Sequence, residues 1–219
     1  MPQQRVGSPP RAFTVTILIF VATVGQLLVA TFATDLPQFA GKGFGARLVA
    51  YPLLMLLVPA GWFLLRRLRP DTAWASVPWT AFALIMAPFL VDVTGNTLNL
   101  YDSVVWWDDA NHFANWFLLC SGIGLLLMLK RITPAWAVGM LVAGIGAVLA
   151  LGWELGEWYT FIRHGTELAT AYEDTLADQA LGTAGAVLAG VLVVGRLSAS
   201  AAPGPSRPAG SGSFPRRSG

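Results

Sequence analysis

The sequence has few charged residues. Only 12% of its 219 residues are Asp, Glu, Lys or Arg, whereas a soluble domain has about 25%. Hydrophobic residues make up 55% of the chain. So many apolar side chains must face something other than water, which excludes an ordinary water-soluble domain.

Cysteine and familiar catalytic motifs are also scarce. Cys120 is the only cysteine, so an intramolecular disulfide is excluded. It lies in an apolar run, where a small apolar filler is expected rather than a reactive thiol. The sequence contains neither Gly-x-Ser-x-Gly nor His-Glu-x-x-His, which excludes enzymes that depend on those two motifs.

Long apolar runs are abundant instead. About 20 apolar residues in a helix cross a hydrocarbon core about 30 Å thick. The runs lack the alternation of a barrel strand, so helices that satisfy their own amides are expected. The sequence therefore predicts an all-α, polytopic membrane protein, a six-helix transmembrane bundle in the lipid bilayer. Its six runs are Ala12–Ala33, Ala46–Leu65, Ala73–Val91, Asp109–Leu129, Pro134–Trp153 and Thr175–Val194.

The two ends of the chain differ in composition. The first run is too long for the apolar core of a secretory signal, so we expect it to remain as a helix. Residues 198–219 are rich in Pro, Gly and Ser. Such a segment cannot bury a core, so we predict a transmembrane domain over residues 1–197 and a disordered cytoplasmic tail over 198–219.

Basic and acidic residues lie mostly in loops on opposite sides of the predicted membrane. With both termini in the cytoplasm, most of the basic residues lie on the cytoplasmic side, which is the usual bias of short loops. Nearly all of the acids then lie on the outer side. The basic residues are too scattered for a nucleic-acid partner. We therefore predict a multi-pass protein of a bacterial inner membrane with both termini cytoplasmic. The three basic residues on the outer side are Lys42, Arg47 and Arg163.

The stretch WWDDANHF opens the fourth run with a polar helix face. Asp108 lies four residues before His112, and Asp109 lies three before it. On a helix both acids therefore share the face of the histidine. An Asp at a helix start also caps free amides and complements the helix dipole. Capping alone does not account for His112.

Three other runs bring acids to the same outer depth. Glu154 and Glu157 share a helix face at the end of the fifth run. Asp174 and Asp178 are four residues apart at the start of the sixth, where capping is the alternative. Asp92 follows the apolar part of the third run, where a carboxylate is costly without a partner.

Convergence of these faces would require a cation, because neighbouring carboxylates repel one another. A divalent metal held by carboxylate oxygens and one imidazole resolves that repulsion. We therefore predict a metal site and, for catalysis, Glu154, Glu157 and His112. The candidate metal ligands are Asp92, Asp108, Asp109, His112, Glu154, Glu157, Asp174 and Asp178.

Three short motifs follow one another along the chain. They are Asp-x-x-x-His-Phe at Asp108, His112 and Phe113, Glu-Leu-x-Glu-Trp at Glu154, Leu155, Glu157 and Trp158, and Asp-Thr-x-x-Asp at Asp174, Thr175 and Asp178. In this order they resemble the YjdF-like family of small bacterial inner-membrane proteins and, more distantly, the VanZ-like proteins. Leu176 replaces an expected glutamine, and HGTELATAYE replaces a Gly-Thr-Gln-Gly-like stretch, as in a divergent member. The association of VanZ-like proteins with lowered susceptibility to glycopeptide antibiotics implies action at the outer envelope.

Three functions remain open on the sequence alone. The first is metal-dependent action on a lipid-linked or envelope ligand, with Glu154 or Glu157 as base and His112 as ligand or acid. The second is a cation- or proton-coupled transporter, although the inner halves of the helices carry almost no ionisable residue to continue a relay. The third is a non-catalytic membrane scaffold. Whether the protein is an enzyme is left undecided.

Overall fold

Six long helices make up most of the part of the chain that the structure describes. The computed structural model describes five stretches of the chain, residues 11–70, 76–130, 132–160, 162–164 and 170–201. Each long helix is long and apolar enough to cross a membrane, which confirms the predicted all-α polytopic bundle. Two short helices, α4 (Leu100–Ser103) and η1 (Ile162–His164), lie between them. The long helices are α1 (Arg11–Phe32), α2 (Phe44–Leu68), α3 (Trp79–Thr97), α5 (Trp107–Met128), α6 (Ala135–Thr160) and α7 (Ala171–Ala201).

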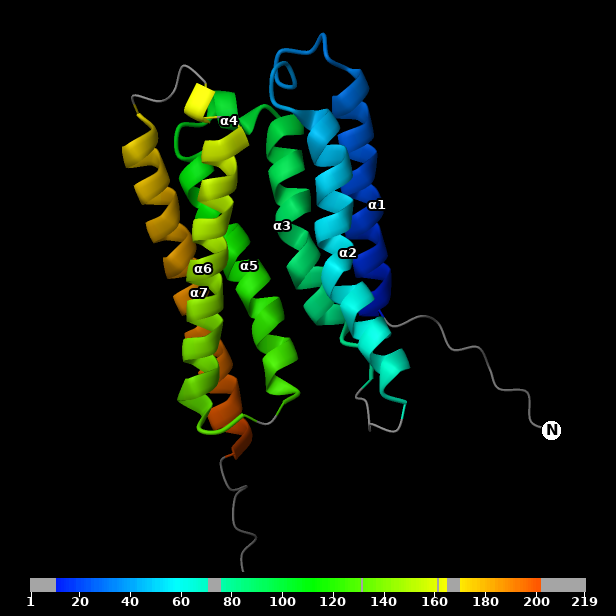
Figure 1. Ribbon diagram of the computed structural model, residues 1–219, viewed down its shortest axis with the longest axis vertical. Helices are drawn as coiled ribbons and strands as arrows, with labels where there is room; N and C mark the ends of the chain where they lie inside the picture. The colour runs from blue at the N-terminus through cyan, green and yellow to red at the C-terminus, as the bar shows by residue number, and fades with distance from the viewer. Residues whose placement is uncertain (1–10, 71–75, 131, 161, 165–169, 202–219) are drawn as a thin grey trace, which may run out of the picture.

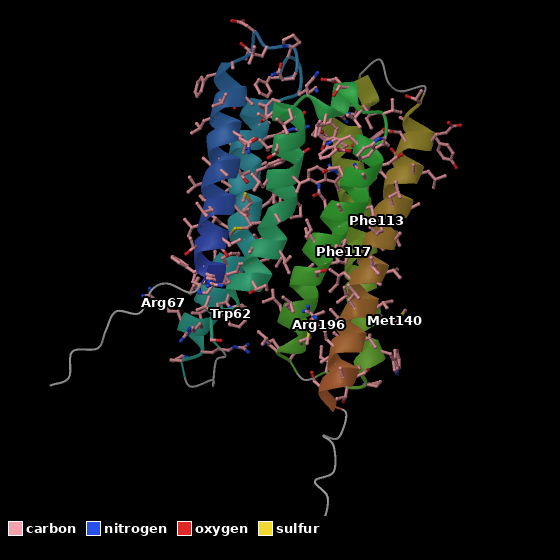
Figure 2. The ribbon with its side chains drawn as sticks, turned by 180° about the vertical axis from the view of Figure 1, so that it is seen from behind. Trp62, Arg67, Phe113, Phe117, Met140 and Arg196 are labelled. Atoms are coloured by element: carbon pink, nitrogen blue, oxygen red, sulfur yellow. The ribbon has the colours of Figure 1, made fainter. Side chains whose placement is uncertain are left out.

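The helices form two groups of three. Helices α1, α2 and α3 pack together, as do α5, α6 and α7, and contacts between α3 and α5 join the two groups (Figure 1). The first turn of α1 and the last turn of α7 lie at one end of the bundle, where Arg67 and Arg196 also lie (Figure 2). We call the opposite end, with α4, η1 and the first turns of α5 and α7, the polar end. Placing the other end in the cytoplasm stays a prediction from the charges.

The ends of the helices differ from those of the apolar runs. Helix α3, at Trp79–Thr97, lies six residues later in the chain than the predicted run Ala73–Val91. Helix α5 begins at Trp107, two residues before the expected start, and α7 continues to Ala201, four residues past the expected end of the transmembrane domain. Alanine favours a helix, and the Ser200 hydroxyl donates a hydrogen bond to the Arg196 carbonyl at 2.9 Å. Apolar residues mark the part of a helix that lies in lipid, and the helix itself can continue into water. The rest of the predicted tail lies outside the described residues.

Small residues let α7 approach its neighbours closely. A Cβ atom added at Gly190 would lie 2.7 Å from the carbonyl oxygen of Gly139 in α6. One added at Gly182 would lie 2.6 Å from the Trp116 ring in α5. Ala186 is completely buried. The stripe Gly182, Ala186 and Gly190 is thus a packing surface, in the way that small residues commonly join membrane helices.

Gly185 provides a test of this packing. A Cβ atom there would collide with the carbonyl oxygen of Phe113 and lie 2.9 Å from the amide nitrogen of Phe117, and backbone atoms of α5 cannot rotate away. We expect Gly185→Ala to destabilise the protein by about 1–3 kcal/mol. At roughly 2–4 °C per kcal/mol for a chain of this size, thermal unfolding in detergent should resolve the loss.

Gly144 is the matched control. It lies in the middle of α6, where a Cβ atom would meet nothing within 4 Å. Gly144→Ala should leave stability unchanged or raise it by up to about 1 kcal/mol, because alanine is the better helix former. Equal unfolding temperatures for the two variants would contradict the packing described for α5 and α7.

Candidate metal centre

The centre is built around His112 on α5. The ring is 8% exposed and lies in the second turn of the helix. Trp106 is the N-cap residue of α5 and makes no side-chain capping hydrogen bond, so neither Asp108 nor Asp109 is the cap. Both acids lie in the first turn, where a negative charge complements the helix dipole.

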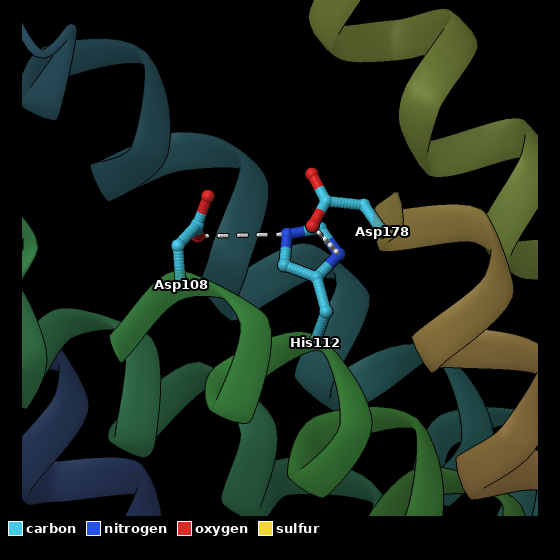
Figure 3. Close-up of side chains that lie close together, drawn as sticks. All are labelled: Asp108, His112 and Asp178. Carbon is cyan, nitrogen blue, oxygen red and sulfur yellow. Dashed lines mark ion pairs between the residues drawn. The ribbon is translucent and has the colours of Figure 1, made fainter. Parts of the chain in front are cut away.

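Three helices bring carboxylates to the two ring nitrogens. The Nδ1 atom of His112 lies 3.6 Å from Glu154 Oε1 on α6 and 3.6 Å from Asp178 Oδ1 on α7. The Nε2 atom lies 3.7 Å from Asp108 Oδ1, one turn earlier on α5. Figure 3 shows Asp108 and Asp178 on opposite sides of the imidazole. Two acids therefore share one nitrogen, while the third faces the other.

These contacts are too long for hydrogen bonds, which span about 2.7–3.2 Å. Within the described part of the chain, His112 Nδ1 and Glu154 Oε1 are buried and have no hydrogen-bond partner. Glu154 and Asp178 are each 3% exposed. Buried polar atoms are nearly always paired, since burying them unpaired is costly. The unpaired imidazole nitrogen between two buried carboxylates therefore makes this cluster a candidate ligand-binding site.

The spacing fits ligands of one metal ion. Two atoms each about 2.1 Å from a tetrahedral zinc lie roughly 3.4 Å apart, close to the separation of His112 Nδ1 from each acid. Potential ligand atoms of Asp108, His112 and Asp178 all lie within 4.8 Å of one another, as do those of His112, Glu154 and Glu157. The five residues can thus supply a ligand set of carboxylate oxygens and one nitrogen.

Three of the eight predicted ligands lie apart from this centre, and two of them are at the surface. Asp109 and Asp174 are both exposed, and neither belongs to the two groups of close ligand atoms found among the described residues. Asp174 also lines a cavity beside the centre. Its backbone amide donates to the Thr170 carbonyl at 3.3 Å, so Asp174 belongs to the first turn of α7.

Asp92 belongs to a separate network. Its Oδ2 atom accepts hydrogen bonds from Arg47 Nη1 at 3.1 Å and from the Tyr51 hydroxyl at 2.7 Å. Its Oδ1 atom accepts one from the Tyr101 hydroxyl at 2.8 Å. Burial and the neighbouring Asp92 raise the pKa of Tyr101 above its ordinary value, so this hydroxyl stays a donor. Asp92 therefore ties α2, α3 and α4 together.

Two asparagines connect this network to α5. Asn111 Nδ2 donates to the Tyr101 hydroxyl at 2.6 Å, and Asn115 Nδ2 donates to Asn111 Oδ1 at 2.9 Å. Sequence reasoning missed this network. The presence of Arg47, one of only three basic residues predicted on the outer side, is the one signal that could have pointed to a partner for Asp92.

A cavity of about 310 Å³ lies between the centre and the Asp92 network. Helices α2, α3, α5, α6 and α7 all contribute to its wall. His112, Asp178 and Glu157 line it, whereas Glu154 is not part of its wall. A ligand in the cavity would therefore meet the centre from the side of Asp178 and Glu157.

The fold and these spans define a polytopic helical membrane protein. The chain belongs to the family described as "Predicted membrane protein (DUF2238)", whose model matches residues 16–199. No curated protein and no solved structure matches the chain. The narrower kinship with YjdF-like or VanZ-like proteins stays a prediction.

Proposed function

We propose that the protein is a metal-dependent membrane enzyme that acts on a lipid-linked or envelope ligand. One observation carries the proposal: His112 Nδ1 lies 3.6 Å from carboxylates of two other helices and has no hydrogen-bond partner among the residues that the structure describes. A shared divalent cation accounts for all three groups at once, since it neutralises the acids and accepts the nitrogen lone pair.

The positions of the side chains suggest their roles. His112 Nδ1, Glu154 and Asp178 would bind the metal, and Asp108 would hold the Nε2 proton and so fix the ring orientation, as carboxylates often do for metal-binding histidines. A divalent metal would activate water as a nucleophile. Glu157 faces the cavity and lies close enough to accept a proton, so it is the proposed base.

The proposal also includes the orientation of the protein in the membrane and its kinship with YjdF-like proteins. The excess of basic residues in the loops at the end with the termini supports a cytoplasmic position for that end and an outer position for the polar end. The three motifs that resemble YjdF-like proteins contain the five residues of the centre. Their meeting around one imidazole supports a shared site in a divergent member of that group.

The test is the metal content of the purified protein. After equilibration with Zn²⁺ or Mn²⁺ and removal of free metal, elemental analysis should find about one ion per chain, because the proposed site is single. A Glu154→Gln, His112→Ala double variant should retain almost none. An Asp109→Asn, Glu173→Gln variant, altered only at exposed acids, is the matched control and should bind like the parent. Metal-free parent protein, or unchanged binding in the first variant, would contradict the proposal.

A further inference from the structure

The cavity changes character with depth. Its charged residues lie at the polar end, whereas Pro88, Phe89, Leu119 and Trp116 form its inner wall. At a rise of about 1.5 Å per residue, Leu119 lies about 18 Å along α5 from Trp107, and Phe89 about 12 Å from the last residue of α3. The cavity thus runs from a charged rim into the apolar middle of the bundle. That gradient suits a molecule with a polar head and an apolar chain.

The excess of acidic residues in the cavity wall favours a ligand with a cationic head group. Both basic residues of the wall already have acidic partners, Lys42 with Asp102 at 2.7 Å and Arg47 with Asp92 at 3.1 Å. Four further acids line the cavity without a lysine or arginine partner among the wall residues, namely Asp108, Glu157, Asp174 and Asp178. Asp108 and Asp178 face the single imidazole of His112. One divalent ion offsets only part of the charge of the four acids. The remaining excess repels an anionic head and attracts a cationic one.

The aromatic residues of the wall and the volume of the cavity restrict the class of ligand further. Tyr51 and Trp153 belong to the wall and lie with ring centroids 6.5 Å apart, and Trp116 of α5 belongs to the wall as well. Aromatic faces attract ammonium groups. The volume lies at the small end of the range for small-molecule sites, about 300–1,000 Å³. It suits one chain rather than the two of a common phospholipid.

We propose that the cavity binds a single-chain amphiphile with an amine head group. The ammonium lies beside Glu157 and Asp174 at the rim, and the chain lies along Phe89 and Leu119. The proposal names the substrate class of the site described above and rests on the proposed function only for the reaction. The cavity and its excess of acids are present whether or not the centre binds metal.

The experiment compares three photoreactive probes on metal-loaded protein in an uncharged detergent. Each carries the same ten-carbon chain with a diazirine, and the heads are an amine, a hydroxyl and a phosphate. We expect the amine probe to label α3 and α5 near Phe89 and Leu119 about tenfold more than the phosphate probe, a ratio that corresponds to about 1.4 kcal/mol. Equal or stronger labelling by the phosphate or hydroxyl probe would overturn the proposal.

Competition separates an amphiphile from a free amine. Unlabelled decylamine should suppress the labelling, whereas ethylamine at the same concentration should not, because only the longer molecule reaches the apolar wall. Suppression by both would overturn the proposal in favour of a small-amine site. Suppression by neither would show that the probe reacts from the detergent phase and would overturn it as well.

A cavity-filling variant adds a second readout. Leu119→Trp should reduce labelling by the amine probe about tenfold while metal content stays at the level of the parent. Leu141→Trp, at a residue 43% exposed on α6, is the matched control and should label like the parent. Equal labelling of both variants would overturn the amphiphile site. The proposed function has a separate test: if the parent protein binds no metal but the amine probe still labels it, the proposed function fails and the amphiphile site stands.

Discussion

Replacing His112 by alanine is expected to weaken metal binding more than about a hundredfold, beyond the 10–100-fold range typical of outer-shell partners. His112 is the only nitrogen ligand in either group of close ligand atoms. Without the imidazole, only the carboxylates of Glu154 on α6 and Asp178 on α7 remain as ligands, and two ligands bind an ion more weakly than three. Titration of the detergent-solubilised protein against a chelating metal indicator measures the change.

Two neighbouring acids provide graded controls for that result. Asp108 faces Nε2, whereas Glu154 and Asp178 face Nδ1, so Asp108→Asn should weaken metal binding about 10–100-fold through the orientation of the ring. Asp109 is exposed, and Asp109→Asn should change nothing. A loss for Asp108→Asn as large as for His112→Ala would instead make Asp108 a ligand and Nε2 the binding nitrogen.

Replacing Asp92 by alanine should lower the free energy of unfolding by about 3 kcal/mol. The substitution removes the acceptor of three hydrogen bonds and leaves the Arg47 guanidinium, only 20% exposed, without its carboxylate. Removing one partner of a buried ion pair typically costs about 3–5 kcal/mol, and partial exposure places this case at the low end. Reversible unfolding in mixed detergent gives the value.

Asp102→Ala is the control for the Asp92 prediction. Asp102 also pairs with a basic residue, Lys42, but its side chain is 49% exposed, so the loss should stay below about 1 kcal/mol. Folded Asp92→Ala protein should retain its metal, because the Asp92 carboxylate belongs to the Arg47 and tyrosine network. Metal loss from folded Asp92→Ala protein, with no loss of stability, would place Asp92 among the ligands.

The fold was predictable because bilayer thickness dictates the length of an apolar helix. Runs such as Ala12–Ala33 agree with α1 to within a residue. The short helices α4 and η1 were missed, since they lie outside the apolar runs and bury little apolar surface. The pairing of α3 with α5, which joins the two groups of helices, depends on close packing at Gly122 that no periodicity reveals.

The candidate site was predictable in part. Helical spacing placed Asp108 with His112, and shared depth brought in Glu154, Glu157 and Asp178. Spacing could not separate Asp108 from Asp109, because both lie within one turn of His112. Packing of α5 against α6 and α7 buries one side of that turn and leaves Asp109 in solvent.

The role of Asp92 illustrates what spacing leaves out. A carboxylate at that depth needs a partner, and the shared depth of the acids predicted a metal for it. The structure instead gives it Arg47 and Tyr51 from α2, 45 and 41 residues earlier in the chain. A tyrosine in an apolar run has no distinguishing pattern, so only the three-dimensional packing of α2 against α3 reveals the donor.

The most direct measurement is a crystal structure of the zinc-loaded protein with diffraction recorded at the zinc absorption edge. The account predicts one anomalous peak about 2.0–2.2 Å from His112 Nδ1 and from carboxylate oxygens of Glu154 and Asp178. A peak bound through Nε2, a peak elsewhere in the chain, or protein that binds no zinc at all would contradict the account.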